Sequence, residues 1–309
     1  MSKSNLATRI AQIGLALLSL TFAGTASALY VEMFAIGDFV PGASGGCGGD
    51  DRSSWPGMAE AWYNRMGDFG HFKAGKRVDD NITLQRFCDP SFDSDCRDYS
   101  SGAGGSVLGV DWADAAIVAF HGWDAGDHWG GTMRYPWKGF CAIEAGGSSN
   151  EVRLGDSWIV FFHASSCQSA DDDNLDGIRF AMEDASTSTT RRAHQWDGFH
   201  GLMWISSSYN DDYRDTASDG HYASVAYSWV TNHHKSNSQG CEWYDPWNWF
   251  DTCRDQCPIA YAISNSLDNA LTRLTNERYN FVYGDPPDNN WYAIMYYENC
   301  HPAGEDPFL

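Results

Sequence analysis

The sequence predicts an α/β fold, with a mainly parallel sheet and helices on both of its faces. Apolar runs of strand length alternate along the chain with segments of helical periodicity, which is typical of parallel strands joined by right-handed helical crossovers. Two of the runs, Ala115–Phe120 and Trp158–Phe162, are almost continuously apolar, as expected of strands covered on both faces. No internal repeat or long linker interrupts the pattern, so residues 29–309 are expected to form one domain.

Six segments have the length and composition of strands. Each is short, rich in aliphatic or aromatic residues, and bounded by charged or turn-forming residues. In chain order they are Leu29–Ile36, Ile82–Phe87, Ala115–Phe120, Trp158–Phe162, Ile259–Ser264 and Trp291–Tyr297.

Four segments carry apolar residues at helical spacing. The first follows Pro56, and proline favours the first turn of a helix. In chain order they are Met58–Met66, Leu175–Ala185, Tyr222–Asn232 and Leu267–Arg278. The segment Phe87–Gly109, rich in glycine, serine and aspartate, is expected to be a loop.

The first 28 residues have the pattern of a secretory signal peptide. Lys3 and Arg9 precede the apolar run Ile13–Ala23, and a small-residue cleavage site ends at Ala28. A membrane-spanning helix is the alternative, but it needs about 18 or more continuous apolar residues. We therefore expect an exported mature chain, periplasmic or extracellular, without a membrane span.

The chain is strongly acidic. It has 20 lysines and arginines against 41 aspartates and glutamates, a formal net charge of −21. This charge excludes nucleic acid and anionic membranes as expected partners, because both repel an acidic surface. A solvated acidic surface is the main interpretation, and binding of cations is the alternative.

The nine cysteines divide into eight and one. Eight lie in polar, glycine- or aspartate-rich surroundings typical of loops, and loop cysteines of an exported protein are expected to form disulfides. These eight are Cys47, Cys88, Cys96, Cys141, Cys241, Cys253, Cys257 and Cys300. Cys167 alone follows an apolar strand, so we expect it to be unpaired. The pairing of the other eight stays open among about 105 possibilities.

A zinc site is the alternative for part of this set. Cys253 and Cys257 have a ligand-like spacing, and His233 and His234 precede them. The chain offers no second Cys-x2-Cys pair, and export favours oxidation, so disulfides are favoured over zinc.

Two apolar runs end in residues that can react. Ala115–Phe120 is followed by His121 and Gly122, and the strand beginning at Trp158 runs up to Cys167. Because ligands bind beyond the carboxyl ends of parallel strands, we expect the imidazole and the thiol to share one edge of the sheet.

That pairing suits nucleophilic catalysis. A histidine beside a cysteine can accept the thiol proton and later protonate a leaving amine. The backbone N–H groups of Gly122 and Cys167 could then form an oxyanion hole. A buried thiol that only packs, together with a histidine that only makes a hydrogen bond at the strand end, is the structural alternative.

A strand ending in His-Gly, followed by a strand ending in Ala-Ser-Ser-Cys, resembles the caspase-like cysteine peptidases, the clan of caspases, legumain, gingipains and clostripain. In that clan the histidine also precedes the cysteine. The resemblance implies a caspase-like three-layer sandwich, with His121 as general base and acid, Cys167 as nucleophile and Gly122 as oxyanion donor. The clan often works with a dyad, so a third member is not required.

A closer resemblance is to a largely bacterial domain-of-unknown-function family with the same layout, and it covers most of Leu29–Pro287. The family pattern includes a Phe-x-Gly-Leu-His segment and a Gly-Phe turn after the cysteine strand. Here Phe199–Leu202 reads Phe-His-Gly-Leu, Met203 stands at the position of the family histidine, and Ser206–Ser207 replaces Gly-Phe.

Four other polar residues lie near these motifs and have either a structural or a functional interpretation. His163 falls within a strand and is expected to pack in the interior. Asp124 and His128 follow the candidate base and could line the cleft or only form its wall. Asp197 and His200 are candidates for a third catalytic member.

The segment 172–183 fits the EF-hand pattern D-x-[DN]-x-[DN]-G-x5-E. Its calcium ligands would be the carbonyl of Ile178 and the side chains of Asp172, Asn174, Asp176 and Glu183. The alternative is an acidic helix start, because carboxylates are favourable near a helix N-terminus. The resemblance permits calcium, since several members of the clan depend on it.

The sequence thus predicts an exported cysteine peptidase that hydrolyses peptide bonds in a peptide or protein substrate with a His121/Cys167 dyad. No cofactor is required for this chemistry, and calcium is an optional one. The alternative is a non-catalytic caspase-like binding module of the cell exterior, stabilised by calcium. Its Trp-rich segment Trp243–Phe250 could bind glycan or protein, or pack over the sheet edge. The preferred substrate residue and the oligomeric state stay open.

Overall fold

The computed structural model describes residues 28–97, 109–146, 152–155, 158–182, 193–236, 255–286, 290–297 and 300. The segment predicted to be a signal peptide lies outside these ranges, apart from Ala28, and so does Trp243–Phe250. None of the helices within the ranges carries an apolar stretch that would reach across a bilayer.

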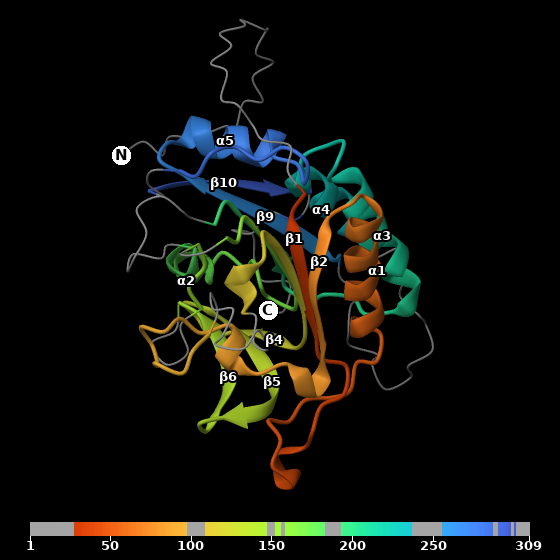
Figure 1. The fold of residues 1–309 in the computed structure, drawn as a ribbon, viewed down its shortest axis with the longest axis vertical. Helices are drawn as coiled ribbons and strands as arrows, with labels where there is room; N and C mark the ends of the chain where they lie inside the picture. Colours follow the sequence, from red (N-terminus) through yellow and green to blue (C-terminus); the bar gives the residue numbers. More distant parts are fainter. Residues whose placement is uncertain are drawn as a thin grey trace, which may run out of the picture.

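A seven-stranded sheet forms the centre of the molecule, in the order β10-β9-β8-β7-β3-β1-β2 (Figure 1). Its strands are β1 (Tyr30–Ala35), β2 (Phe72–Val78), β3 (Ala115–Ala119), β7 (Phe161–Ser165), β8 (Gln195–His200), β9 (Cys257–Ser264) and β10 (Trp291–Tyr296). The strands from β2 to β8 pair in parallel, and β9 and β10 add antiparallel strands at one side. The prediction of an α/β fold with a mainly parallel sheet is confirmed.

Helices lie on both sides of this sheet. Figure 1 shows α1 (Trp55–Asp68), α3 (Asn210–Asp219) and α4 (Val225–His233) together on one side, and α2 (Leu175–Ala181) on the other. The fifth helix, α5 (Leu267–Asn276), packs along β9 and β10. Every residue of β3, β7 and β9 is buried between these layers, and burial of each large aliphatic or aromatic side chain stabilises the fold by about 1.5–3 kcal/mol.

A small antiparallel sheet follows β3 directly. It consists of β4 (Gly122–Asp124), β5 (Trp129–Trp137) and β6 (Phe140–Ala145), in the order β4-β5-β6. A disulfide between Cys47 and Cys141 joins β6 to the loop after β1. This sheet therefore forms a wall beside the carboxyl end of β3.

Some element boundaries differ from those predicted. The strand predicted at Ile82–Phe87 is wrong: the chain there forms short 3-10 turns, Asp79–Asn81 and Leu84–Arg86, because Phe87 N–H bonds to the Leu84 carbonyl at 2.9 Å instead of to a neighbouring strand. β7 is displaced by three residues from the predicted strand Trp158–Phe162, because it begins at Phe161 and ends at Ser165. β2, β8, α3 and the small sheet are not predicted by the sequence pattern.

The cysteines largely follow the prediction. Cys47–Cys141, Cys88–Cys96 and Cys257–Cys300 form disulfides, and Cys167 is the free thiol of the described residues. Cys241 and Cys253 lie outside those residues. The zinc interpretation is wrong for Cys257, because its sulfur is bonded to Cys300.

Candidate active site

The carboxyl ends of β3 and β7 lie side by side. The two strands are parallel neighbours, with Ala119 paired to Ser165, and His121 and Cys167 each come two residues later. The segments remain in contact beyond the strands, because Asp124 N–H donates to the side-chain oxygen of Gln168 at 2.8 Å. The predicted shared edge of the sheet is therefore present.

His121 is half-buried in an aromatic niche. Its ring centroid lies 4.7 Å from that of Phe39 and 4.8 Å from that of Trp55. Its Nε2 lies 2.7 Å from the backbone carbonyl oxygen of Asp50. Because a carbonyl only accepts hydrogen bonds, Nε2 must carry the proton, and Nδ1 is left as the basic nitrogen of the neutral ring.

The surroundings of His121 favour this neutral form. Burial lowers the pKa of His121, and the positive charge of Arg52 lowers it further, against the opposing effect of the hydrogen bond to the Asp50 carbonyl. A neutral imidazole with a free Nδ1 is the form that a general base requires.

Cys167 is partly exposed, and its thiol is protonated at rest. Burial raises the pKa of Cys167, while the N–H of Met203 and the charge of Arg52 oppose that rise. The Met203 N–H donates to Sγ at 3.5 Å. Because the thiol is not ionised beforehand, its attack on a substrate requires a base that accepts the proton during the reaction.

Gly122 directs its N–H away from β5, toward the cysteine segment. Thr132 N–H bonds to the His121 carbonyl at 2.9 Å, and Gly122 is paired with Gly131 in β5. Bonded and non-bonded pairs alternate in antiparallel ladders, so the Gly122 N–H points away from β5. The Asp124 N–H has the same orientation, and it reaches Gln168.

A side chain at Gly122 would not fit. An added Cβ would lie 2.2 Å from Ser166 Oγ, 2.4 Å from the Cys167 carbonyl oxygen and 2.6 Å from Trp129 Nε1. Glycine is thus needed here for the close approach of two chain segments rather than for an unusual backbone angle.

The turn after Cys167 is held firmly. Gln168 adopts a left-handed backbone, with φ of 55°, and its N–H donates to the Gly201 carbonyl at 2.7 Å. Its own carbonyl accepts from the Asn174 side chain at 2.8 Å. Ser169 Oγ donates to the Ala164 carbonyl at 2.7 Å. These bonds fix the thiol at the edge of the sheet.

The other candidate histidines and aspartates have different partners. His163 is fully buried, as predicted, and its Nδ1 lies 2.8 Å from Asp197 Oδ2. His200 Nδ1 lies 3.0 Å from Asp171 Oδ1. Asp197 and His200 therefore partner residues other than His121, and the group that meets His121 is the carbonyl of Asp50.

The loop residues Asp124 and His128 follow His121 but make local contacts. Asp124 accepts from the Gly126 N–H at 2.6 Å. His128 pairs with Asp127 and lies 3.6 Å from Glu144. Asp124 ends β4, and His128 lies in the turn that leads to β5 of the small sheet that walls the site.

The segment predicted to bind calcium contains the start of helix α2. Helix α2 begins at Leu175, within the motif, and the Ile178 carbonyl accepts from the Met182 N–H at 2.9 Å. Asn174 is buried, whereas the Asp176 side chain is 90% exposed. The acidic helix start, the alternative to the calcium loop, is what the structure has. Glu183 lies outside the described residues.

Asp172 instead lies in a different cluster, together with Asp171 and His200. Ligand atoms of the three side chains are all within 4.8 Å of one another. The pKa of Asp172 is raised, first by burial and then by Asp171. For Asp171, burial is the largest single cause and favours a higher pKa, but the hydrogen bond from His200, its charge and the hydrogen bonds with Asp172 together lower the pKa.

Comparisons of the chain with models of protein families, with curated proteins and with solved structures find no match.

Proposed function

We propose that this chain is an exported cysteine peptidase with a caspase-like arrangement, in which Cys167 is the nucleophile and His121 the general base. The observation that carries the proposal is the pairing of two neighbouring strand ends: one bears the free thiol, the other a histidine whose Nε2 is committed to a carbonyl. Disulfides elsewhere in the chain are compatible with export.

The first half of the reaction forms a thioester. The sulfur of Cys167 attacks the carbonyl carbon of the scissile peptide bond, and the thiol proton moves to Nδ1 of His121. The carbonyl electrons shift to oxygen, where the N–H groups of Gly122 and Cys167 stabilise the negative charge. The C–N bond then breaks, and His121 returns the proton to the leaving amine.

The second half releases the product. A water molecule loses a proton to Nδ1 of His121 and attacks the thioester carbon. The C–S bond breaks, the sulfur of Cys167 regains the proton, and a carboxylic acid leaves. His121 thus acts once as base and once as acid in each half, which requires that its pKa lie near or below neutrality.

The carbonyl of Asp50 supplies what a third side chain would otherwise supply. It fixes the ring orientation and the tautomer of His121 without adding a charge. A dyad aligned in this way is consistent with Asp197 and His200 partnering other residues.

Met203 stands at the position where the resembled family has histidine. The backbone N–H of Met203 is the group that meets the thiol, and its sulfur accepts from the Ser165 hydroxyl at 3.3 Å. The contact with Cys167 is therefore made by the main chain, which any residue at this position provides.

The test is hydrolysis of a fluorogenic peptide library by the mature protein and by His121→Ala and Cys167→Ser variants. We expect both changes to lower kcat/KM by about 10²–10⁴-fold, the range of a lost general base or nucleophile. His128→Ala, a histidine of the adjacent wall, is the matched control and should retain full activity.

A second measurement examines the thiol directly. Iodoacetamide labelling of Cys167, mapped by mass spectrometry, should be slow at pH 7 and accelerate with rising pH, because burial raises the pKa of this thiol. A library that is not cleaved, together with His121→Ala having no effect on the labelling, would refute the peptidase. The non-catalytic binding module would then be the better hypothesis.

A further inference from the structure

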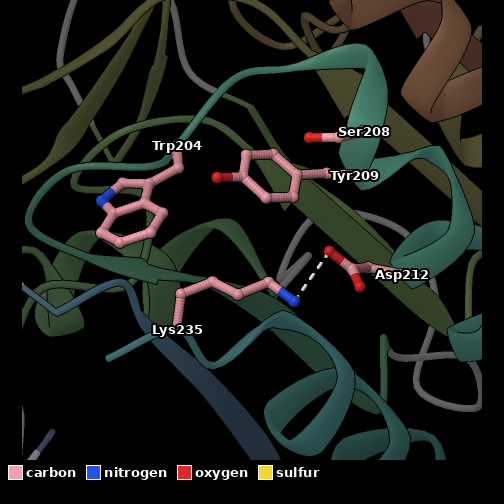
Figure 2. Close-up of a pocket in the computed structure, with 5 residues that line it drawn as sticks. All are labelled: Trp204, Ser208, Tyr209, Asp212 and Lys235. Atoms are coloured by element: carbon pink, nitrogen blue, oxygen red, sulfur yellow. Dashed lines mark ion pairs between the residues drawn. The ribbon is translucent and has the colours of Figure 1, made fainter. Parts of the chain in front are cut away.

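One pocket of the described residues includes Trp204, which follows Met203 in the chain. It is an open hollow with a volume of about 420 Å³, lined by Trp204, Ser208, Tyr209, Asp212 and Lys235 (Figure 2). The residues come from the segment after β8, from the first turn of α3 and from the chain just after α4.

Two of its lining residues are sequence neighbours of residues that contact the cysteine segment. Trp204 follows Met203, whose N–H donates to the sulfur of Cys167. Asp212 precedes Tyr213, whose hydroxyl bonds to Ser165 at the end of β7. Trp204 and Asp212 are thus each one residue away from a group that contacts Cys167 or the end of its strand.

The lining is aromatic on one side. The ring centroids of Trp204 and Tyr209 lie 6.4 Å apart, and Figure 2 shows the extended methylene chain of Lys235 running beneath both rings. This lining suits a side chain with a long apolar stem.

At Asp212 the pocket already holds a positive charge, the ammonium group of the chain's own Lys235. The ammonium of Lys235 lies 2.9 Å from Asp212 Oδ2 and 5.6 Å from the centre of the Tyr209 ring. An aromatic face and a carboxylate together form a site for a cation. The pair uses one oxygen of Asp212, and a carboxylate can accept from several donors.

The local charge is negative despite Lys235. Asp211 and Asp215 flank Asp212 on α3, and Arg214 is shared between them, at 2.9 Å and 3.7 Å. Three carboxylates are thus set against two cations in this region, and Asp212 is the one of the three that lines the pocket. The whole chain carries a net charge of −21, which attracts cationic ligands and repels anionic ones.

From this geometry we infer that the Trp204–Asp212 pocket is a substrate subsite for a basic side chain, arginine or lysine. The inference rests on the proposed function, because it assumes that a peptide lies across Cys167. The apolar stem of the basic residue packs against Trp204 and Tyr209, and its charged end shares Asp212 with Lys235. An acidic side chain would meet the excess negative charge and is disfavoured.

The experiment measures binding without requiring catalysis. Acetylated alanine tetrapeptide amides carry one arginine at each position in turn, and a matched set carries citrulline, which has the same shape but no charge. Each peptide is tested for protection of Cys167 against iodoacetamide in the mature protein. At one position, arginine should protect about five- to tenfold more strongly than citrulline, the ratio expected for one partly exposed charge contact together with stacking.

Two variants assign this preference to the pocket. Asp212→Asn should abolish the preference for arginine, and Trp204→Leu should reduce it. Asp211→Asn is the matched control, because it removes the same charge from an exposed side chain one residue away and should keep the preference. Thermal unfolding of each variant verifies that it is folded.

The outcomes separate this inference from the proposed function. Equal protection by arginine and citrulline at every position, or a preference that survives in Asp212→Asn, overturns the basic subsite even if peptides are cleaved. A preference that depends on Asp212 in a protein that cleaves no peptide supports the subsite, and the catalytic proposal alone then fails.

Discussion

Two histidines on neighbouring strands, His121 after β3 and His163 within β7, show how differently this fold uses the same side chain. His163 has the stronger partners: Nδ1 lies 2.8 Å from Asp197, and Nε2 lies 2.9 Å from the Tyr279 hydroxyl. It is fully buried and stacked 5.3 Å from Trp229. Within the described part of the chain, the hydrogen-bond partner of His121 is a backbone carbonyl, and its ring is half-buried and adjacent to the segment of the free thiol.

In this protein, pairing of a histidine with a carboxylate does not by itself indicate a catalytic residue. The His163–Asp197 pair has both nitrogens occupied and no access for a substrate, so its role is structural. The weaker arrangement at His121 leaves one nitrogen free at a strand end. Access and a free nitrogen, rather than hydrogen-bond strength, distinguish the candidate base.

The largest expected effect separates stability from activity at these two positions. His163→Ala should lower the free energy of unfolding by about 3–5 kcal/mol, because it removes a fully buried ring and leaves the buried carboxylate of Asp197 with only the amide of Gln195. Chemical denaturation measures this loss. His121→Ala should change the same quantity by less than about 1 kcal/mol, since His121 is half-buried and loses one hydrogen bond. A larger loss of unfolding free energy for His121→Ala than for His163→Ala would contradict the structural role of His163.

Gly122→Ala tests how tightly the two strand ends approach. The added methyl group would lie 2.2 Å from Ser166 Oγ and 2.4 Å from the Cys167 carbonyl, so the segments must separate. We expect a loss of about 1–3 kcal/mol in unfolding free energy and a larger, at least tenfold, loss of peptide hydrolysis, because the thiol and the oxyanion donors shift. Gly126→Ala on the same wall has no atom near the added carbon, but its φ of 89° strains any side chain. It therefore controls for stability loss without a change at Cys167.

The buried histidine His71 tests whether burial keeps an imidazole ring neutral in this fold. Leu29 N–H donates to His71 Nδ1 at 2.9 Å, and His71 Nε2 lies 2.7 Å from His221 Nε2. Burial, followed by the nearby His221, lowers the pKa of His71 to about 4. Between pH 6.5 and pH 4 the unfolded chain therefore binds a proton at this position that the folded chain does not bind.

Stability should accordingly fall as the pH decreases through that window, and this histidine should contribute about 1–2 kcal/mol to the fall. The slope of unfolding free energy against pH measures it, and His71→Gln should make the slope shallower. His128→Asn, at the surface of the small sheet, should leave the slope as it is. Identical slopes for the wild-type protein and His71→Gln would show that His71 is not held neutral.

The sequence pattern predicted what depends on local composition. The buried runs of β3 and β7 and the reactive residues at their ends follow from apolar stretches and the residues that terminate them. The isolation of Cys167 followed from its apolar setting, which differs from that of the other cysteines. These features are encoded within a few neighbouring residues.

Features that depend on tertiary packing were missed. β8 reads QWDGFH, and its Asp197 and His200 are buried only because residues distant in the sequence pair with them. α3 is almost entirely polar, and β2 is an edge strand with charged residues. The carbonyl of Asp50 has no signature at all, since every residue has a backbone carbonyl and only the long loop after β1 brings this one to His121.

The segment 172–183 fits a calcium-binding pattern, and helix α2 begins inside it at Leu175. With Ile178 bonded within α2 and Asp176 exposed, we expect added calcium, after treatment with a chelator, to shift the melting temperature by less than about 1 °C. An unchanged melting temperature would indicate that the second buried pair, His200 with Asp171, is structural. It would then resemble the pair of His163 with Asp197. A rise of several degrees that Asp172→Asn removes would instead show a cation held between Asp171, Asp172 and His200, whose ligand atoms are already within 4.8 Å of one another.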